Sequence, residues 1–106
     1  MTNRKINKAI AEHLGWKELD FHLDGKHILG DRPSFFNGKI VSYTVDQYVP
    51  DYCNNLNAMA EAENVLTTVQ TTTMSQYLHR RLGMLWGFAT ASQRAEAFVR
   101  TIGKWD

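Results

Sequence analysis

The fold is decided by a polar–apolar alternation that runs into a turn signal, Glu18-Leu19-Asp20-Phe21-His22-Leu23-Asp24-Gly25. Alternation with a period of two puts successive side chains on opposite faces, which is typical of a half-buried β-strand. The dipeptide Asp24-Gly25 predicts a two-residue hairpin turn, followed by a return strand over residues 26–29. A second turn signal, Asn37-Gly38, precedes a β-rich run over residues 39–45. We therefore predict antiparallel strands in this part of the chain.

A helix is expected before these strands. Its apolar stripe follows the i, i+3, i+4, i+7, i+8 pattern and consists of Ile6, Ala9, Ile10, His13 and Leu14. Thr2 or Asn3 can act as the N-cap, because their short polar side chains accept free backbone N–H groups. Gly15 suits the left-handed position that commonly ends a helix.

Three further helices are expected in the C-terminal half. The first begins near Pro50, the second covers residues 74–82 and ends at Gly83, and the last starts at Thr90 with Gln93 as its capping-box partner. The connections are predicted to be a loop over residues 30–33, a β-prone or loop segment over residues 67–73 and a short strand over residues 84–88.

Helices at both ends with hairpins between them predict an α+β fold. The chain has 106 residues, and we expect residues 1–106 to form one domain. The simplest way to bury the apolar stripes is to lay the first and last helices on a small antiparallel sheet within residues 16–45.

Composition excludes several classes of protein. The 12 Lys and Arg residues nearly balance the 11 Asp and Glu residues, whereas a protein that coats nucleic acid needs a strong basic excess. The single cysteine, Cys53, excludes an intrachain disulfide and a thiolate-rich metal site. No apolar run approaches the roughly 20 residues of a membrane span, so we expect a cytoplasmic protein. No Ser–His–acid, Cys–His or P-loop pattern is present, and we expect neither an enzyme nor a cofactor.

Three segments carry a resemblance to a known family. They are the first helix with its Trp16, the run VPDYCNNLNAM over residues 49–59, and ATASQRAEAF over residues 89–98 with its closing TIGKW. Together they resemble the phage ABA sandwich domain family, small proteins of phages and prophages. The resemblance implies a sheet between helices (α–β–α) and a phage origin, hence the cytoplasm of the host cell. It implies no catalytic residues, because the family has no established common activity.

The start of the last helix predicts an anion site. Thr90, Ser92 and Arg94 place two hydroxyls and a guanidinium on the first turn, where free N–H groups and the helix dipole favour negative charge. The alternative is that Thr90 is an ordinary N-cap and that Arg94 pairs with a nearby acid.

A basic pocket with aromatic walls would extend this site. Arg80 and Arg81 would meet Arg94 there, and Trp86 or Tyr52 would stack on a base. The alternative is a solvated helix end, since basic residues favour helix C-termini in any case.

Two histidines flank the first hairpin turn. If Leu23 pairs with Lys26, His22 faces His27, and Asp20 lies on the same face. Two imidazoles and a carboxylate can bind a metal ion. That face is expected to be solvated, because apolar side chains such as Leu23 take the opposite face. We therefore predict no metal site.

Three classes of function remain. The first is a non-enzymatic, phage-encoded protein that binds a small anionic ligand and sequesters a nucleotide-type signal of host immunity. The second is a protein–protein interaction module that inhibits a host factor. The third, a nucleic-acid binder, is disfavoured by the net charge of +1. Trp16, Trp86 and Trp105 are either core caps or interface residues, and we expect a homo-oligomer.

Overall fold

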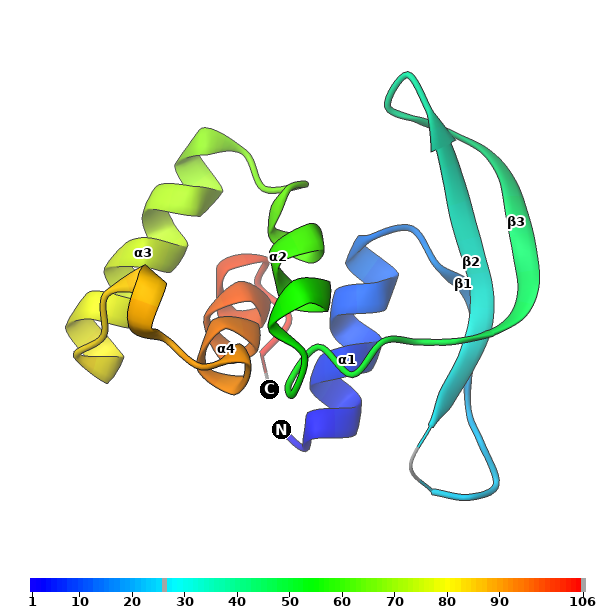
Figure 1. Ribbon diagram of the computed structural model, residues 1–106, viewed down its shortest axis with the longest axis horizontal. Coiled ribbons are helices and arrows are strands. Elements are labelled where there is room, and N and C mark those ends of the chain that lie inside the picture. Colours follow the sequence, from blue (N-terminus) through cyan, green and yellow to red (C-terminus); the bar gives the residue numbers. More distant parts are fainter. Residues whose placement is uncertain (26, 106) are drawn as a thin grey trace.

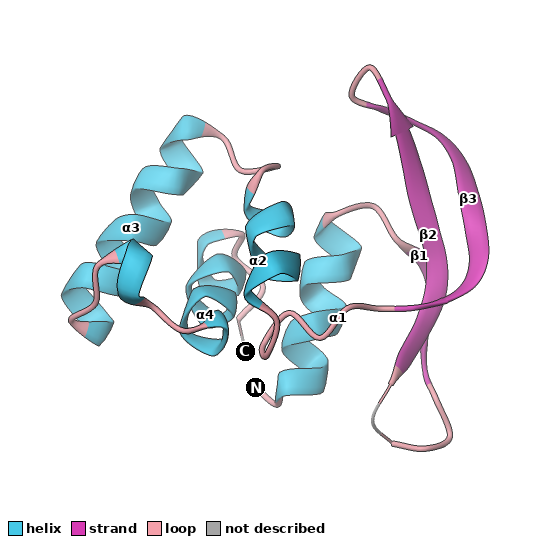
Figure 2. Ribbon diagram, in the orientation of Figure 1, coloured by secondary structure: helices cyan, strands magenta, loops and turns pink. Residues whose placement is uncertain are grey.

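Four helices lie on one side of a three-stranded antiparallel sheet (Figures 1 and 2). This computed structural model describes residues 1–25 and 27–105, to which all counts refer. The elements are, in chain order, α1 (Asn3–His13), β1 (Lys17–Phe21), β2 (Ile28–Phe36), β3 (Lys39–Tyr48), α2 (Leu56–Glu63), α3 (Thr68–Leu82), the 3₁₀ turn η1 (Trp86–Phe88) and α4 (Ala91–Thr101). The predicted α+β class is confirmed. The expected placement of the sheet between helices is wrong, because all four helices lie on the same side of it (Figure 1).

Helix α1 has the ends that the sequence predicts and most of the predicted buried face. The Thr2 hydroxyl accepts a hydrogen bond from the backbone N–H of Lys5 at 3.2 Å. Gly15 follows the helix with a φ of +97°, in the left-handed region. Ile6 and Ile10 are buried on the predicted stripe, but the expectation that His13 is buried there is wrong, because His13 lies at the exposed end of the helix.

The strands pair in sequence order, β1–β2–β3, and both pairs are antiparallel. The predicted tight turn at Asn37-Gly38 is confirmed. Both residues have positive φ, +52° and +75°, and Phe36 pairs with Lys39 across the turn. Two consecutive positive φ angles are the geometry that joins twisted strands through two residues.

The first hairpin turn is wider than predicted. Beyond the last strand pair, the N–H of His22 donates to the carbonyl of His27 at 2.9 Å. The predicted partner of Leu23, Lys26, lies outside the described residues. Leu23 itself is fully exposed, so the expectation that it shares the buried face is wrong. Leu23 lies in the turn beyond the end of β1, where side chains no longer alternate between the two faces of the sheet.

Residues 30–33 lie inside β2, so the prediction of a loop there is wrong. At Gly30 the strand passes close to the end of α1. An added Cβ would lie 2.6 Å from the Leu19 side chain and 3.3 Å from the Trp16 ring. Pro33 pairs with β3 between two register shifts. Glycine and proline here mark a close approach and a bulged strand rather than a connection.

Helix α2 begins at Leu56 and not near Pro50. The intervening segment forms turns, because a side chain of α1 takes its hydrogen bonds. Asn7 Nδ2 donates to the Asp51 carboxylate at 3.0 Å, and Asn7 Oδ1 accepts from the N–H of Cys53 at 3.2 Å. These long-range hydrogen bonds hold the segment in turns, so that the helix starts only at Leu56.

Helix α3 is longer than predicted and includes the Thr-rich segment. Thr67 and Gln70 form a capping box, in which each side chain accepts the other residue's N–H. The hydroxyls of Thr72 and Thr73 donate to carbonyls one turn back, at 3.0 Å each. The prediction of a β-prone or loop segment over residues 67–73 is therefore wrong, because a cap and internal hydrogen bonds override the β propensity of threonine.

The connection from α3 to α4 differs from the prediction between its two ends, which both form as predicted. Gly83 ends α3 with a φ of +65°, as predicted. The expected strand over residues 84–88 is instead a loop with the turn η1, which lies on the far side of the molecule from the sheet (Figure 1). Thr90 and Gln93 form the predicted capping box of α4.

The helices bury their apolar faces mainly against one another. Ile10, Met59, Leu78 and Phe98, one from each helix, are fully buried. Helix α4 packs against α1, α2 and α3, and α1 lies between the sheet and α4 (Figure 1). The expectation that the first and last helices both pack on the sheet therefore holds for α1 only.

Candidate functional site

The predicted anion site at the start of α4 is occupied by the cap of that helix. The Thr90 hydroxyl accepts the N–H of Gln93 at 3.1 Å, and Gln93 Oε1 accepts the N–H of Thr90 at 2.9 Å. Ser92 is exposed on the same turn. The N–H of Gln93 is thus already used within the protein.

Arg94 forms an ion pair with Glu63 of α2. Arg94 Nε lies 3.3 Å from Glu63 Oε1, and the two side chains are only 19% and 9% exposed. The contact lacks the alignment of a hydrogen bond, so the attraction is mainly between charges. Burial raises the pKa of Glu63, while Arg94 and a hydrogen bond from Trp86 oppose that rise. The alternative weighed for Arg94, pairing with a nearby acid, is the observed arrangement.

The other predicted residues do not gather around Arg94. Trp86 lies beside it, with the guanidinium carbon 5.8 Å from the ring centre. Arg80 and Arg81 are exposed on the last turn of α3. Tyr52 lies in a different place, in the wall of a cavity that none of the other six predicted residues lines. The structure therefore separates the predicted set into unrelated parts.

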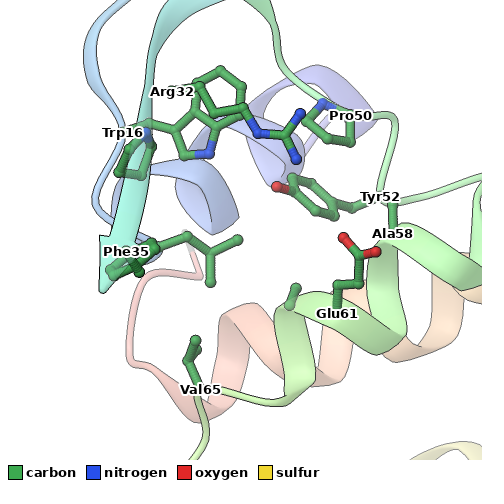
Figure 3. Close-up of a pocket in the computed structure, with 11 residues that line it drawn as sticks. Trp16, Arg32, Phe35, Pro50, Tyr52, Ala58, Glu61 and Val65 are labelled. Atoms are coloured by element: carbon green, nitrogen blue, oxygen red, sulfur yellow. The ribbon is translucent and has the colours of Figure 1, made fainter. Parts of the chain in front are cut away.

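That cavity, of about 270 Å³, opens between β2, the end of α1 and α2 (Figure 3). Its walls combine aromatic and charged side chains. The rings are Trp16, Phe35 and Tyr52, and the charged groups are Arg32 and Glu61. Small-molecule sites are typically such concave, largely apolar spaces with a few polar groups.

The aromatic walls are held by the fold. Trp16 follows α1, and its backbone N–H donates to the carbonyl of Ala11 at 3.1 Å. Its ring lies against Gly30, where the absence of a side chain lets the ring approach β2. Tyr52 is only 3% exposed, in the turn segment that Asn7 holds. Two of the three rings are therefore fixed before any ligand enters.

Arg32 and Glu61 face the same cavity without forming an ion pair. Figure 3 shows the guanidinium and the carboxylate on opposite sides of the Tyr52 ring in that view. Within the described part of the chain, neither group has a hydrogen-bond or ion-pair partner. Arg32 lies 6.0 Å from the Trp16 ring centre, which is a cation–π distance. Both charges are exposed and remain available to a ligand.

Tyr52 adds a neutral hydroxyl to this set. Burial raises the pKa of Tyr52 to about 12; Arg32 lowers it and Glu61 raises it by smaller amounts. At neutral pH the phenol therefore stays protonated and can donate a hydrogen bond.

A second cavity, of about 390 Å³, lies beside the start of α1 and the first hairpin turn. Its polar side chains are largely bonded to the protein itself. Arg4 donates to the carbonyl of Gly25 at 2.6 Å, and Asn7 and Asn54 both donate to Asp51. This cavity offers fewer free groups than the one beside Tyr52.

Both histidines contact the carboxylate of Asp24, whereas the sequence predicts Asp20 beside them. His22 Nδ1 and His27 Nδ1 are 3.3 Å and 2.6 Å from the two carboxylate oxygens of Asp24. The Tyr48 ring lies beside both imidazoles. Across residues 1–25 and 27–105, no group of three or more His, Cys, Asp or Glu side chains could hold a metal ion.

Sequence reasoning missed Arg32, Glu61 and Phe35. Arg32 lies in a segment that the sequence predicts to be a loop. Glu61 lies on α2, a helix that the sequence predicts to begin near Pro50. The available signal was the Trp16 that follows Gly15, because a large ring at a helix end needs a surface to cover. Nothing local in the sequence indicates which residues share that surface.

No family model, curated protein or solved structure matches this chain. The resemblance to the phage ABA sandwich domain family therefore stays a prediction. Of the helices described, none is long and apolar enough to cross a membrane.

Proposed function

We propose that this protein is a non-enzymatic binding protein for a small, nucleotide-type anionic ligand, and that the ligand binds in the cavity beside Tyr52. The observation that carries the proposal is Arg32, a guanidinium that lies at the mouth of an aromatic cavity and has no acidic partner among residues 1–25 and 27–105. The proposed site is not at Arg94, because the charge of Arg94 is already paired with Glu63.

The chemistry of the walls favours such a ligand. Flat heterocycles stack on aromatic rings, and Trp16, Phe35 and Tyr52 offer three. An arginine attracts negative charge and donates in a planar fork that suits phosphate. The volume of about 270 Å³ is close to the lower end of ligand pockets, which start at roughly 300 Å³. A nucleoside with its phosphate at the mouth is therefore the expected size.

The biological setting of the proposal comes from the resemblance. A phage-encoded protein in the host cytoplasm that binds a nucleotide signal of host immunity would act as a counter-defence protein. Sequestration needs no catalysis, because a bound signal no longer reaches its receptor. Such a role requires only tight binding and enough copies of the protein.

Thermal shift with a panel of nucleotides and nucleotide second messengers tests the proposal. A ligand that binds only the folded state at 100 times its Kd stabilises it by about 2.7 kcal/mol. Arg32→Ala should weaken binding by roughly tenfold or more, since hydrogen bonds to charged groups are worth about 1.5–3 kcal/mol. Arg80→Ala is the matched control, because Arg80 is an exposed arginine outside the cavity. Equal losses in both variants would contradict the site.

The alternative, a protein-interaction module that inhibits a host factor, is favoured by a different observation. The β2–β3 hairpin exposes large apolar side chains, among them Phe36 at 68% and Val41 at 62%. Strand β3 is also an edge of the sheet. Exposed apolar patches and unpaired edges are common in interfaces, including those of the expected homo-oligomer.

Two variants separate the alternatives. If the hairpin carries the function, Val41→Lys should abolish the biological effect in infected cells, while Arg32→Ala should leave it intact. If the cavity carries it, the two variants should have the opposite effects. Sedimentation velocity over a range of concentrations tests the homo-oligomer, and a monomer at every concentration would exclude it.

A further inference from the structure

The cavity carries one positive and one negative side chain. Arg32 offers only hydrogen-bond donors and Glu61 offers only acceptors, and both point into the space beside Tyr52 (Figure 3). No ion pair joins these two groups, so the donors of Arg32 and the acceptors of Glu61 both remain available. A ligand that suits both must present acceptors toward Arg32 and donors toward Glu61.

We propose that the cavity recognises a guanine-type base, with Arg32 donating to its O6 and N7 atoms and Glu61 accepting from its N1–H and exocyclic amine. The proposal rests on the proposed function and names the ligand class of the same site. Arginine bound to O6 and N7 of guanine is a frequent, bidentate contact in base recognition. The N1–H and amine donors are adjacent, so one carboxylate can accept both.

The other bases do not fit this pair of side chains. Adenine has an amine donor where guanine has O6, and an unprotonated N1 that a carboxylate repels. Hypoxanthine keeps O6 and N1–H but lacks the exocyclic amine, so it loses one bond to Glu61. A base with the wrong edge would lack the charge-assisted hydrogen bonds to one of these side chains, which lowers its affinity.

The aromatic walls favour a flat ligand in the cavity that the two charged side chains line. Trp16 is held against β2 at Gly30, and Tyr52 is held in its buried turn. A purine ring beside these walls directs its edge toward the side chains at the rim. Arg32 also contributes Coulombic attraction to a phosphate at the mouth, since charges interact over several ångströms.

Calorimetric titration with GMP, IMP and AMP tests the inference. GMP should bind the wild-type protein about tenfold or more tightly than IMP, which lacks only the exocyclic amine. AMP should bind more weakly still. Phenylalanine serves as a zwitterionic probe, because its carboxylate and ammonium also match an arginine and a glutamate.

Glu61→Gln sharpens the test. A carboxamide both donates and accepts, and it binds adenine in a bidentate manner. The ratio of GMP affinity to AMP affinity should fall about tenfold or more in this variant. Glu18→Gln is the charge-matched control, because Glu18 is an exposed residue of β1 outside the cavity, and it should keep the wild-type ratio. Glu61 is exposed on α2, so the variant should keep the wild-type melting temperature.

The outcomes distinguish this inference from the proposed function. Equal affinities for GMP, IMP and AMP would overturn guanine recognition and leave nucleotide binding standing. An unchanged ratio in Glu61→Gln would also overturn it. No binding of any nucleotide would overturn both proposals, and tight binding of phenylalanine alone would replace the nucleotide with an amino acid.

Discussion

Two arginine–glutamate arrangements flank helix α2, and they differ in what their charges do. Glu63 pairs with Arg94 at 3.3 Å beside Trp86, and both side chains are mostly buried. Glu61, two residues earlier and therefore on another face of the helix, lines the same cavity as Arg32 and Trp16 without an ion pair to Arg32. The residue types are the same in both places. Their burial and the pairing of their charges differ.

The difference separates structure from function. A buried charge must be paired, because an uncompensated charge away from water costs several kcal/mol, on the order of 3–5 kcal/mol when one partner is removed. Arg94 is therefore committed to holding α4 against α2. Arg32 and Glu61 stay hydrated at the mouth of a cavity, so their charges remain available to a ligand.

The largest expected effect is the loss of the buried pair. Arg94→Ala should destabilise the protein by about 2–3 kcal/mol, somewhat below the roughly 3–5 kcal/mol of a fully buried pair because Arg94 is partly exposed. Urea unfolding measures the change. A variant as stable as the wild type, with weakened nucleotide binding, would restore the anion site first expected at Arg94.

Alkaline pH should act on the cavity through Tyr52. Its pKa is about 12 in the folded protein against 10 in the unfolded chain. The folded state therefore keeps its proton longer, and its stability falls as pH rises from 10 to 12, by about 2–3 kcal/mol at 1.36 kcal/mol per unit. Tyr52→Phe should lose this part of the pH dependence in unfolding experiments. An unchanged slope would show that the hydroxyl is not buried.

Acidic pH should act on the buried pair through Glu63. Burial raises the pKa of Glu63 above the 4.5 of the unfolded chain, against the opposing effect of Arg94. The folded state then binds the proton more tightly, so the stabilising contribution of this one group is complete below pH 4.5 and is lost as pH rises through the folded pKa. Glu63→Gln should remove this part of the pH dependence. Stability curves of both proteins from pH 3 to pH 7, a range spanning roughly the carboxylate pKa values, would check it.

The smallest expected effect is on the cavity charges. Arg32→Ala and Glu61→Gln should each change the free energy of unfolding by no more than about 0.5 kcal/mol, as surface substitutions usually do. Chemical unfolding alongside Arg94→Ala provides the comparison. A loss of more than about 1.5 kcal/mol in either variant would mean that these charges support the fold.

Parts of the candidate site follow from the sequence and parts do not. The sequence predicts Tyr52 as a site residue, because its ring can stack on a base. It does not predict Arg32, because Gly30 and Pro33 make that segment resemble a loop. The segment is a strand because it pairs with β3, where Gly30 lies opposite Gln47 and Arg32 opposite Thr44. The residues around Arg94 are of the types found in anion sites. The charge of Arg94 is nevertheless paired with Glu63, which is distant in the sequence.

The sequence by itself determined the features that depend on neighbouring residues. The caps at Thr2 and Thr90, the turn at Asn37-Gly38 and the helix end at Gly83 all form as predicted. Each uses hydrogen bonds or backbone angles within a few positions, so local preference is sufficient. Only the tertiary structure decided that α2 starts at Leu56 rather than near Pro50, and that Arg32 and Tyr52 line the same cavity. Those outcomes depend on contacts between distant segments, where packing outweighs the preference of any single stretch.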